Sequence, residues 1–167
     1  MHILIVEDEK NIRQELKILL ENSLYQVTAL EDFSDVAAVV LRTIPDLVLL
    51  DLSLPEESGF EICAKIRAAS EVPVIFVTGK TDSMDELTGM LKGADDYITK
   101  PFSLKLVLMR IEAVLRRIKE KSEKQKILSA QGIELNKDSH EVYKNGAPVN
   151  LTQLEFELLL TFLNHKN

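Results

Sequence analysis

Polar side chains that stand directly after short apolar runs constrain the fold of this chain most strongly. The runs cover residues 3–6, 47–50 and 74–77, with a weaker one at 97–99. The polar residues that follow them are Glu7, Asp8, Asp51, Thr78 and Lys100. Continuous apolar runs of this length are typical of strands buried on both faces of a parallel sheet. Because ligands bind outside the carboxyl ends of such strands, we expect these side chains to share one site.

The segments between the runs carry apolar residues at helical spacing. The expected apolar faces comprise Ile12, Leu16, Leu19 and Leu20; Val36, Val39, Val40 and Ile44; Ile62 and Ile66 with neighbouring alanines; and Leu104, Leu108, Ile111, Leu115 and Ile118. A further helix is expected over 83–91, and a weaker outer strand over 25–30. This alternation predicts an α/β fold with a five-stranded, parallel, doubly wound sheet of the flavodoxin-like kind.

A second region follows at 127–167, after a first domain over 1–118 and a basic linker over 119–126. Strand-like runs lie at 132–135, 141–144 and 148–151, and Asn145-Gly146 predicts a hairpin between the last two. Thr152 and Glu155 predict a capping box that opens a final helix. Its expected apolar face consists of Leu154, Phe156, Leu158, Leu159 and Phe162. We expect a small antiparallel sheet and a helix that begin a domain whose remainder is absent.

The residues of the expected site suit phosphoryl transfer. Asp51 is the candidate nucleophile, because a carboxylate can form an acyl phosphate and is already deprotonated at neutral pH. Clustered carboxylates require a cation, so we expect Mg²⁺ to be bound by Glu7, Asp8, Asp51 and the main-chain carbonyl of Ser53. Lys100 offers an ammonium and Thr78 a hydroxyl to phosphoryl oxygens.

Each of these residues also has an ordinary structural explanation, such as helix capping for the Glu7-Asp8 pair or a surface position for Lys100. Their joint occurrence at successive strand ends favours the site. A haloacid-dehalogenase-type hydrolase also uses a strand-end aspartate with Mg²⁺, but it requires a second acid where this chain has Ser53. A flavodoxin-like cofactor binder has a phosphate loop rich in hydroxyl and small residues, where this chain has acids. Neither dinucleotide-binding nor P-loop glycine motifs occur.

Composition indicates the compartment. Acidic residues outnumber basic ones, 27 to 20, and Cys63 is the only cysteine. A disulfide framework is therefore excluded, and the three isolated histidines do not form a metal site. The amino terminus lacks the features of a signal peptide, and no apolar run approaches the roughly 20 residues of a membrane span. We expect a cytoplasmic protein without a membrane partner.

The motifs VEDE, LLDLSLPEESG, VTG, GADDYITKPF and RIEAVLRR closely resemble the receiver domain of bacterial two-component response regulators of the OmpR/PhoB-like winged-helix class. The resemblance covers residues 1 to about 118, and 127–167 looks like the start of that class's DNA-binding domain. It implies a CheY-like fold and a phosphoprotein that is not a turnover enzyme. A sensor histidine kinase would phosphorylate Asp51, with Thr78 and Tyr97 as the switch pair and Lys100 as the phosphate-binding lysine.

The resemblance also implies a homodimer through the helix at 83–91, the strand at 97–99 and the helix that follows it. One ion pair usual in this class is missing, because its positions hold Glu86 and Leu106. Asp96 and Arg110 match another cross-dimer pair, and we expect Lys105, next to Leu106, to substitute in part as the partner of Glu86.

Three further positions depart from or modulate the family pattern. Gly79 replaces the usual alanine after the switch threonine, and Ser53 and Lys80 occupy positions that influence phosphoryl lifetime in the family.

The resemblance implies that the protein controls transcription by binding DNA. We expect DNA binding only from a longer protein that contains the recognition helix, because acids outnumber bases from residue 127 onward. Two alternatives stay open. The chain is a receiver that works by protein contacts without phosphorylation, or a truncated regulator that dimerises without binding DNA.

Overall fold

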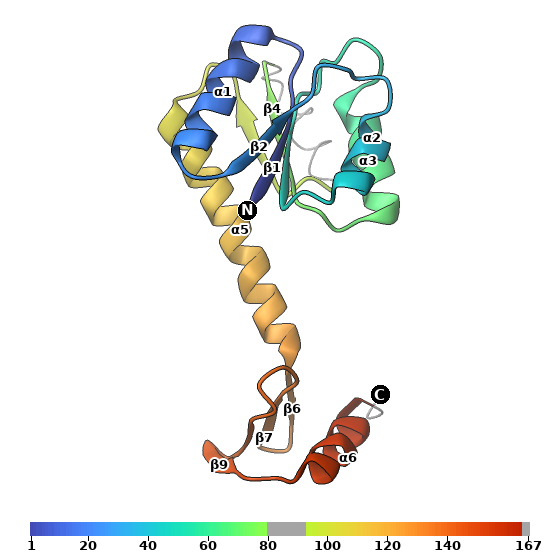
Figure 1. The fold of residues 1–167 in the computed structure, drawn as a ribbon, viewed down its shortest axis with the longest axis vertical. Helices are drawn as coiled ribbons and strands as arrows, with labels where there is room; N and C mark the ends of the chain where they lie inside the picture. Colours follow the sequence, from blue (N-terminus) through green and yellow to red (C-terminus); the bar gives the residue numbers. More distant parts are fainter. Residues whose placement is uncertain (80–92, 165–167) are drawn as a thin grey trace. The chain divides into compact units, whose positions relative to one another are not determined.

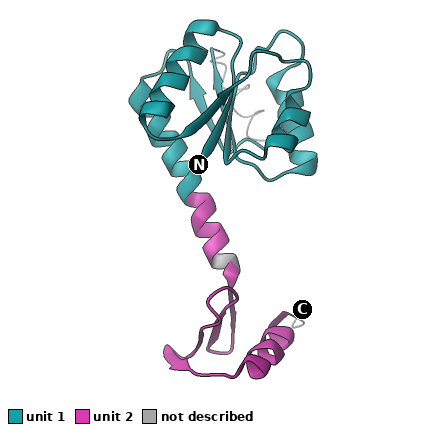
Figure 2. Cartoon of the chain, in the orientation of Figure 1, with its two compact units in different colours: residues 1–116 teal, residues 117–167 magenta. Residues whose placement is uncertain are grey.

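A computed structural model of the chain describes residues 1–79 and 93–164, and Figure 1 shows its course. The expected helix at 83–91, with Lys80 and Glu86, lies outside the described residues. The chain divides into two compact units, Met1–Arg116 and Arg117–Asn167, which Figure 2 distinguishes by colour.

The first unit contains a five-stranded parallel sheet, which confirms the predicted fold class. Its strands are β1 (His2–Val6), β2 (Gln26–Ala29), β3 (Leu47–Leu50), β4 (Val74–Thr78) and β5 (Asp96–Thr99). They lie in the order β2-β1-β3-β4-β5, so the chain runs from β1 to one edge and then crosses back to the other side. The reversal of direction occurs between β1 and β3, where an open α/β sheet provides its ligand crevice.

Helices cover both faces of this sheet because alternate strand residues point to opposite sides. One apolar cluster contains Leu4, Val48 and Phe76 and packs against α2 (Val36–Thr43) and α3 (Gly59–Ala69). The other contains Ile5, Leu49 and Ile75 and packs against α1 (Lys10–Asn22) and α5 (Leu104–Lys126). Figure 1 shows α1 and α5 on one side of the sheet and α2 and α3 on the other.

Several residues expected on the buried faces of these helices lie elsewhere. Ile44 caps α2 in the left-handed conformation (φ 45°) and is 80% exposed, because the helix has already ended. The alanines of α3 are exposed, and Cys63 fills the buried position beside Ile62. In α5 the buried positions include Val107 and Val114, whereas the first and last expected residues, Leu104 and Ile118, are exposed.

The second unit contains an antiparallel sheet in the order β6-β7-β8-β9. Its strands are β6 (Ile127–Ala130), β7 (Ile133–Asn136), β8 (Val142–Lys144) and β9 (Ala147–Val149), and the sequence did not predict β6. Asn145 and Gly146 both have positive φ (50° and 81°) and connect β8 to β9, as the hairpin prediction requires. Residues 119–126, expected as a linker, form the last turns of α5.

The final helix, α6 (Gln153–Asn164), begins with the predicted capping box. The Thr152 amide donates to Glu155 Oε2 (2.8 Å), and the Glu155 amide donates to Thr152 Oγ1 (3.4 Å). Phe156 and Leu159 pack against the sheet, but Leu154, Leu158 and Phe162 are exposed. Residues four positions apart lie on the same side of a helix, so Leu154, Leu158 and Phe162 form one stripe. The predicted face had combined this stripe with the one that contains Phe156 and Leu159. Nowhere in the described part of the chain does a helix have the length and apolarity that a bilayer crossing needs.

Candidate functional site

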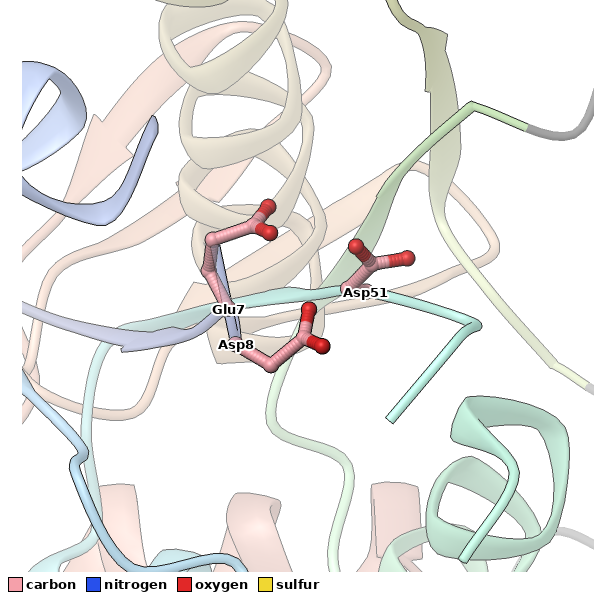
Figure 3. Close-up of side chains that lie close together, drawn as sticks. All are labelled: Glu7, Asp8 and Asp51. Atoms are coloured by element: carbon pink, nitrogen blue, oxygen red, sulfur yellow. The ribbon is translucent and has the colours of Figure 1, made fainter. Parts of the chain in front are cut away.

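Three carboxylates from two neighbouring strands meet at the carboxyl edge of the sheet. Glu7 and Asp8 follow β1, and Asp51 follows β3, which pairs with β1. One oxygen from each carboxylate lies within 4.8 Å of the others. Figure 3 shows the carboxyl groups of Glu7 and Asp8 directed to the same region as that of Asp51. The register of the two strands, Val6 beside Leu50, places their polar successors side by side.

Lys100 brings a single ammonium into this group from the end of β5. Its Nζ lies 2.8 Å from Asp51 Oδ2 and 2.8 Å from each carboxylate oxygen of Glu7. The Lys100 amide donates to the Thr78 carbonyl (2.8 Å), which fixes the backbone of β5 beside β4 at this point. The Lys100-Pro101 peptide bond is cis.

Burial sets the electrostatics of the cluster. The side chains of Glu7, Asp51 and Lys100 are 1%, 4% and 11% exposed. Burial raises the pKa of Glu7 to about 7, and the Asp51 charge adds to this effect while Lys100 opposes it. Burial also acts to raise the pKa of Asp51, but hydrogen bonds from Lys100 and the Ser53 amide hold it below its usual value. At Lys100 burial acts to lower the pKa, but the hydrogen bonds and negative charges of Asp51 and Glu7 outweigh it and raise the pKa.

The cluster fits a hard divalent cation. Its donors are carboxylate oxygens, which suit Mg²⁺. Lys100 Nζ is close to both oxygens of Glu7, but it hydrogen-bonds Oε1, and the buried Oε2 makes no hydrogen bond of its own. The Lys100 cation cannot balance Glu7, Asp8 and Asp51 together, so a second positive charge would relieve their repulsion. Ser53 donates its amide to Asp51 Oδ1 (3.0 Å), which places Ser53 beside the nucleophile, while its carbonyl as a ligand stays a prediction.

Thr78 and Tyr97 lie on the neighbouring strands β4 and β5. Thr78 ends β4 and is fully buried. Tyr97 is 7% exposed and packs edge-on against Phe76, with ring centroids 6.4 Å apart. The ring of Tyr97, expected as a member of the switch pair, is therefore in an inward position in this structure.

Two residues of the site were not predicted from the sequence. Glu9 Oε1 lies 3.2 Å from Lys100 Nζ, and its side chain is 62% exposed. Arg13, in α1, donates through Nη1 to the carbonyl oxygens of Glu7 (2.7 Å) and Asp8 (3.0 Å). In the sequence Glu9 is only an acid after the acidic pair and Arg13 only a basic residue one helical turn later, and neither pattern identifies a site residue.

Asp96 and Arg110, expected as a pair across the dimer, contact each other in the structure. Arg110 Nη1 lies 3.1 Å from Asp96 Oδ1, so the two residues pair within one chain. Leu106 is 36% exposed, and Lys105 is exposed beside it. The dimer stays a prediction, because its third element and Glu86 lie outside the described residues.

Comparison with known proteins decides the family. The model of the response regulator receiver domain matches residues 3–112. The chain belongs to the response regulator receiver family. The match includes four strands of the parallel sheet in full, β1 from its second residue onward, and all the residues of the acidic cluster. This receiver is therefore part of a phosphoryl-accepting, two-component regulator.

Relatives of this receiver share both sequence and fold. The response regulator ArlR of Staphylococcus aureus is 41% identical over 165 residues, which cover 99% of this chain and 74% of ArlR. The receiver domain of Klebsiella pneumoniae RstA, solved in a BeF3-activated form, is 28% identical with a TM-score of 0.66, over 70% of this chain and 99% of that domain. The amino-terminal domain of the nisin resistance regulator NsrR is 38% identical with a TM-score of 0.63, over 69% and 97%.

Proposed function

We propose that this receiver accepts a phosphoryl group on Asp51 from a phosphohistidine of a sensor histidine kinase, with Mg²⁺ bound beside it. The observation that carries the proposal is the state of Asp51: its side chain is 4% exposed, yet the contact with Lys100 and the Ser53 amide lower its pKa. It is therefore a carboxylate at neutral pH and needs no general base. Its relative RstA has been captured in a BeF3-activated form, which supports activation of this kind.

The transfer needs positioning and charge neutralisation more than acid–base chemistry. A carboxylate oxygen of Asp51 forms the bond to phosphorus, and the phosphorus–nitrogen bond of the donor breaks, leaving its electron pair on the histidine. Bound Mg²⁺ would offset the negative charge of the incoming group, held by Glu7, Asp8, Asp51 and the Ser53 carbonyl. Lys100 exchanges a carboxylate contact for a phosphoryl oxygen, and Thr78 donates its hydroxyl. The chain is thus a phosphoacceptor and not a turnover enzyme.

The response to phosphorylation runs through Thr78 and Tyr97. Thr78 moves toward the phosphoryl oxygens and stabilises Tyr97 in its inward position against Phe76. We propose that this shifts the equilibrium of the face that contains β5 and α5 toward a homodimer, in which Asp96, Arg110, Lys105 and Glu86 make contacts between the two subunits. In a protein with a complete winged-helix domain, the dimer then controls binding to DNA and transcription.

The experiment is an intact-mass measurement after incubation with a small phosphodonor and Mg²⁺. The wild-type chain gains one phosphoryl group, and Asp51→Asn and an EDTA-treated sample gain none. A wild-type chain that gains nothing from either a small donor or a histidine kinase contradicts the proposal and leaves a receiver that works by protein contacts alone.

A further inference from the structure

Successive main-chain carbonyls alternate in direction along β1, but the two carbonyls just after the strand point to the same side chain. The Ile5 carbonyl accepts from the Leu30 amide beside β2 (2.9 Å), and the Val6 carbonyl accepts from the Asp51 amide beside β3 (2.9 Å). This alternation is that of an extended strand, in which successive residues face opposite sides. Glu7 and Asp8 break it, because both of their carbonyls accept from the same atom, Arg13 Nη1, at 2.7 and 3.0 Å.

The break matters for the carboxylates. In a continued strand the side chains of Glu7 and Asp8 would point to opposite faces of the sheet, and only one could reach Asp51. In the structure both reach it, with all three carboxylates within 4.8 Å. The backbone turn at Glu7 and Asp8 therefore brings both carboxylates to Asp51, and Arg13 bridges the two carbonyls of this turn.

Other contacts that hold this turn are few in the described part of the chain. Glu9 precedes α1 as its N-cap, but its side chain makes no capping hydrogen bond. The Glu9 amide donates to Glu7 Oε1 (3.2 Å), which holds the Glu7 side chain but neither carbonyl of the acidic pair. The Arg13 amide donates to the Glu9 carbonyl (2.9 Å) as the first bond of the helix. The Arg13 side chain, half-buried, adds the two bonds that reach the acidic pair itself.

We propose that Arg13 is a positioning residue for the cation site: its guanidinium fixes the turn that directs the carboxylates of both Glu7 and Asp8 at Asp51. The inference rests on the proposed Mg²⁺ function of this site. Arg13 touches neither the cation nor the phosphoryl group and acts only through the backbone of the two ligands. Residues that orient metal ligands commonly change metal affinity by about 10- to 100-fold when they are removed.

The sign of the effect separates positioning from simple electrostatics. Arg13 is a cation close to an acidic site, so removing its charge alone makes the site more negative and tightens Mg²⁺ binding. Loss of positioning weakens binding instead. Arg13→Met retains most of the apolar stem while removing both the charge and the donors, so the two explanations predict opposite changes.

The test is an NMR titration of the unphosphorylated chain with Mg²⁺, following the backbone amides of Glu7, Asp8 and Ser53. Arg13→Met is expected to weaken Mg²⁺ binding about tenfold. Lys17→Met is the control, because it removes a cation from the same helix and is expected to leave the affinity within about twofold of wild type; its Nζ lies 4.0 Å from Glu21. Unchanged or tighter Mg²⁺ binding by Arg13→Met overturns the inference.

Arg13→Lys covers the case in which Arg13→Met does not fold, which the dispersion of the amide spectrum reveals. Lysine keeps the charge, but its stem is one bond shorter and cannot reach both carbonyls. It is expected to weaken Mg²⁺ binding at least threefold, and wild-type affinity overturns the inference. The proposed function fails separately, when the wild-type chain neither binds Mg²⁺ nor becomes phosphorylated.

Discussion

Replacement of Glu7 by glutamine tests the electrostatics of the site through stability. The Glu7 carboxyl titrates at about pH 7 in the folded chain, compared with an ordinary value of 4.5. Between these values the folded state holds a proton that the unfolded state has released. Stability therefore falls as pH rises through this window, and it is constant above it. At about 1.4 kcal/mol for each pKa unit, the loss amounts to about 3 kcal/mol.

Glu7→Gln removes this titration while keeping an oxygen that accepts a hydrogen bond from Lys100. The variant is therefore expected to gain about 3 kcal/mol relative to wild type between pH 4.5 and pH 8. The assay is urea unfolding in EDTA at a series of pH values. Ile5→Val, at a fully buried position of β1 two residues before Glu7, is the control. Its cost of about 1 kcal/mol is expected to be the same at every pH.

The reasoning is refuted if the difference between Glu7→Gln and wild type stays constant to within about 1 kcal/mol over this range. Mg²⁺ provides an internal check. A bound cation favours the ionised form of Glu7, so saturating Mg²⁺ is expected to stabilise wild type more at pH 8 than at pH 5. The same addition is expected to have a smaller effect on Glu7→Gln.

Four further substitutions test individual contacts. Lys100→Met leaves two buried carboxylates without their cation and is expected to cost about 3–5 kcal/mol in EDTA at pH 8 by urea unfolding; a loss below about 1 kcal/mol contradicts the burial argument. Gly59→Ala would place a methyl group 2.2 Å from the Asp51 carbonyl oxygen, so we expect a cost of at least about 2 kcal/mol, whereas Gly79→Ala, with no atom within 4 Å, is close to neutral. Equal costs of the two in thermal melts would refute this contrast. Asp35→Ala removes the side-chain acceptor for the Ala38 amide (3.3 Å) that caps α2, and circular dichroism melts are expected to show a loss of about 1 kcal/mol; an unchanged melt would show that this cap contributes nothing.

The parallel sheet could be predicted from the sequence because its central strands are apolar on both faces. Short continuous apolar runs are typical of strands in a parallel sheet that is covered on both faces. The polar residues that follow these runs identify the edge of the sheet where the site lies. The carboxylate cluster could be predicted for the same reason. The strands β1 and β3 are neighbours, Val6 lies beside Leu50, and Glu7 and Asp51 are the next residues of the two strands. Lys100 followed for the same reason at the end of β5.

The helix faces were harder to predict because their periodicity gives a direction but not an end. Ile44 continues the apolar spacing of α2, yet the helix stops before it, and Pro45 follows at once. Leu154 and Leu158 are equally apolar and remain exposed, because two stripes of α6 are hydrophobic and only one packs against the small sheet.

Arg13 could not be predicted as part of the site, because a basic residue in the first turns of a helix has no special pattern. Its importance depends on the direction of two carbonyl groups, which no side-chain pattern encodes. Glu9 was likewise ambiguous, since an acid before a helix is also a common N-terminal residue. Contacts made through the backbone, or by exposed charges, become apparent only when the coordinates are known.

The position of the phosphoryl group tests the central claim most directly. Borohydride reduces an aspartyl phosphate to homoserine, so peptide mapping by mass spectrometry after reduction identifies the modified residue. We predict homoserine at position 51 in the phosphorylated chain and intact aspartate there when Mg²⁺ is withheld. A phosphorylated chain with an unmodified Asp51, or with the reduced residue at position 7 or 8, would contradict the account.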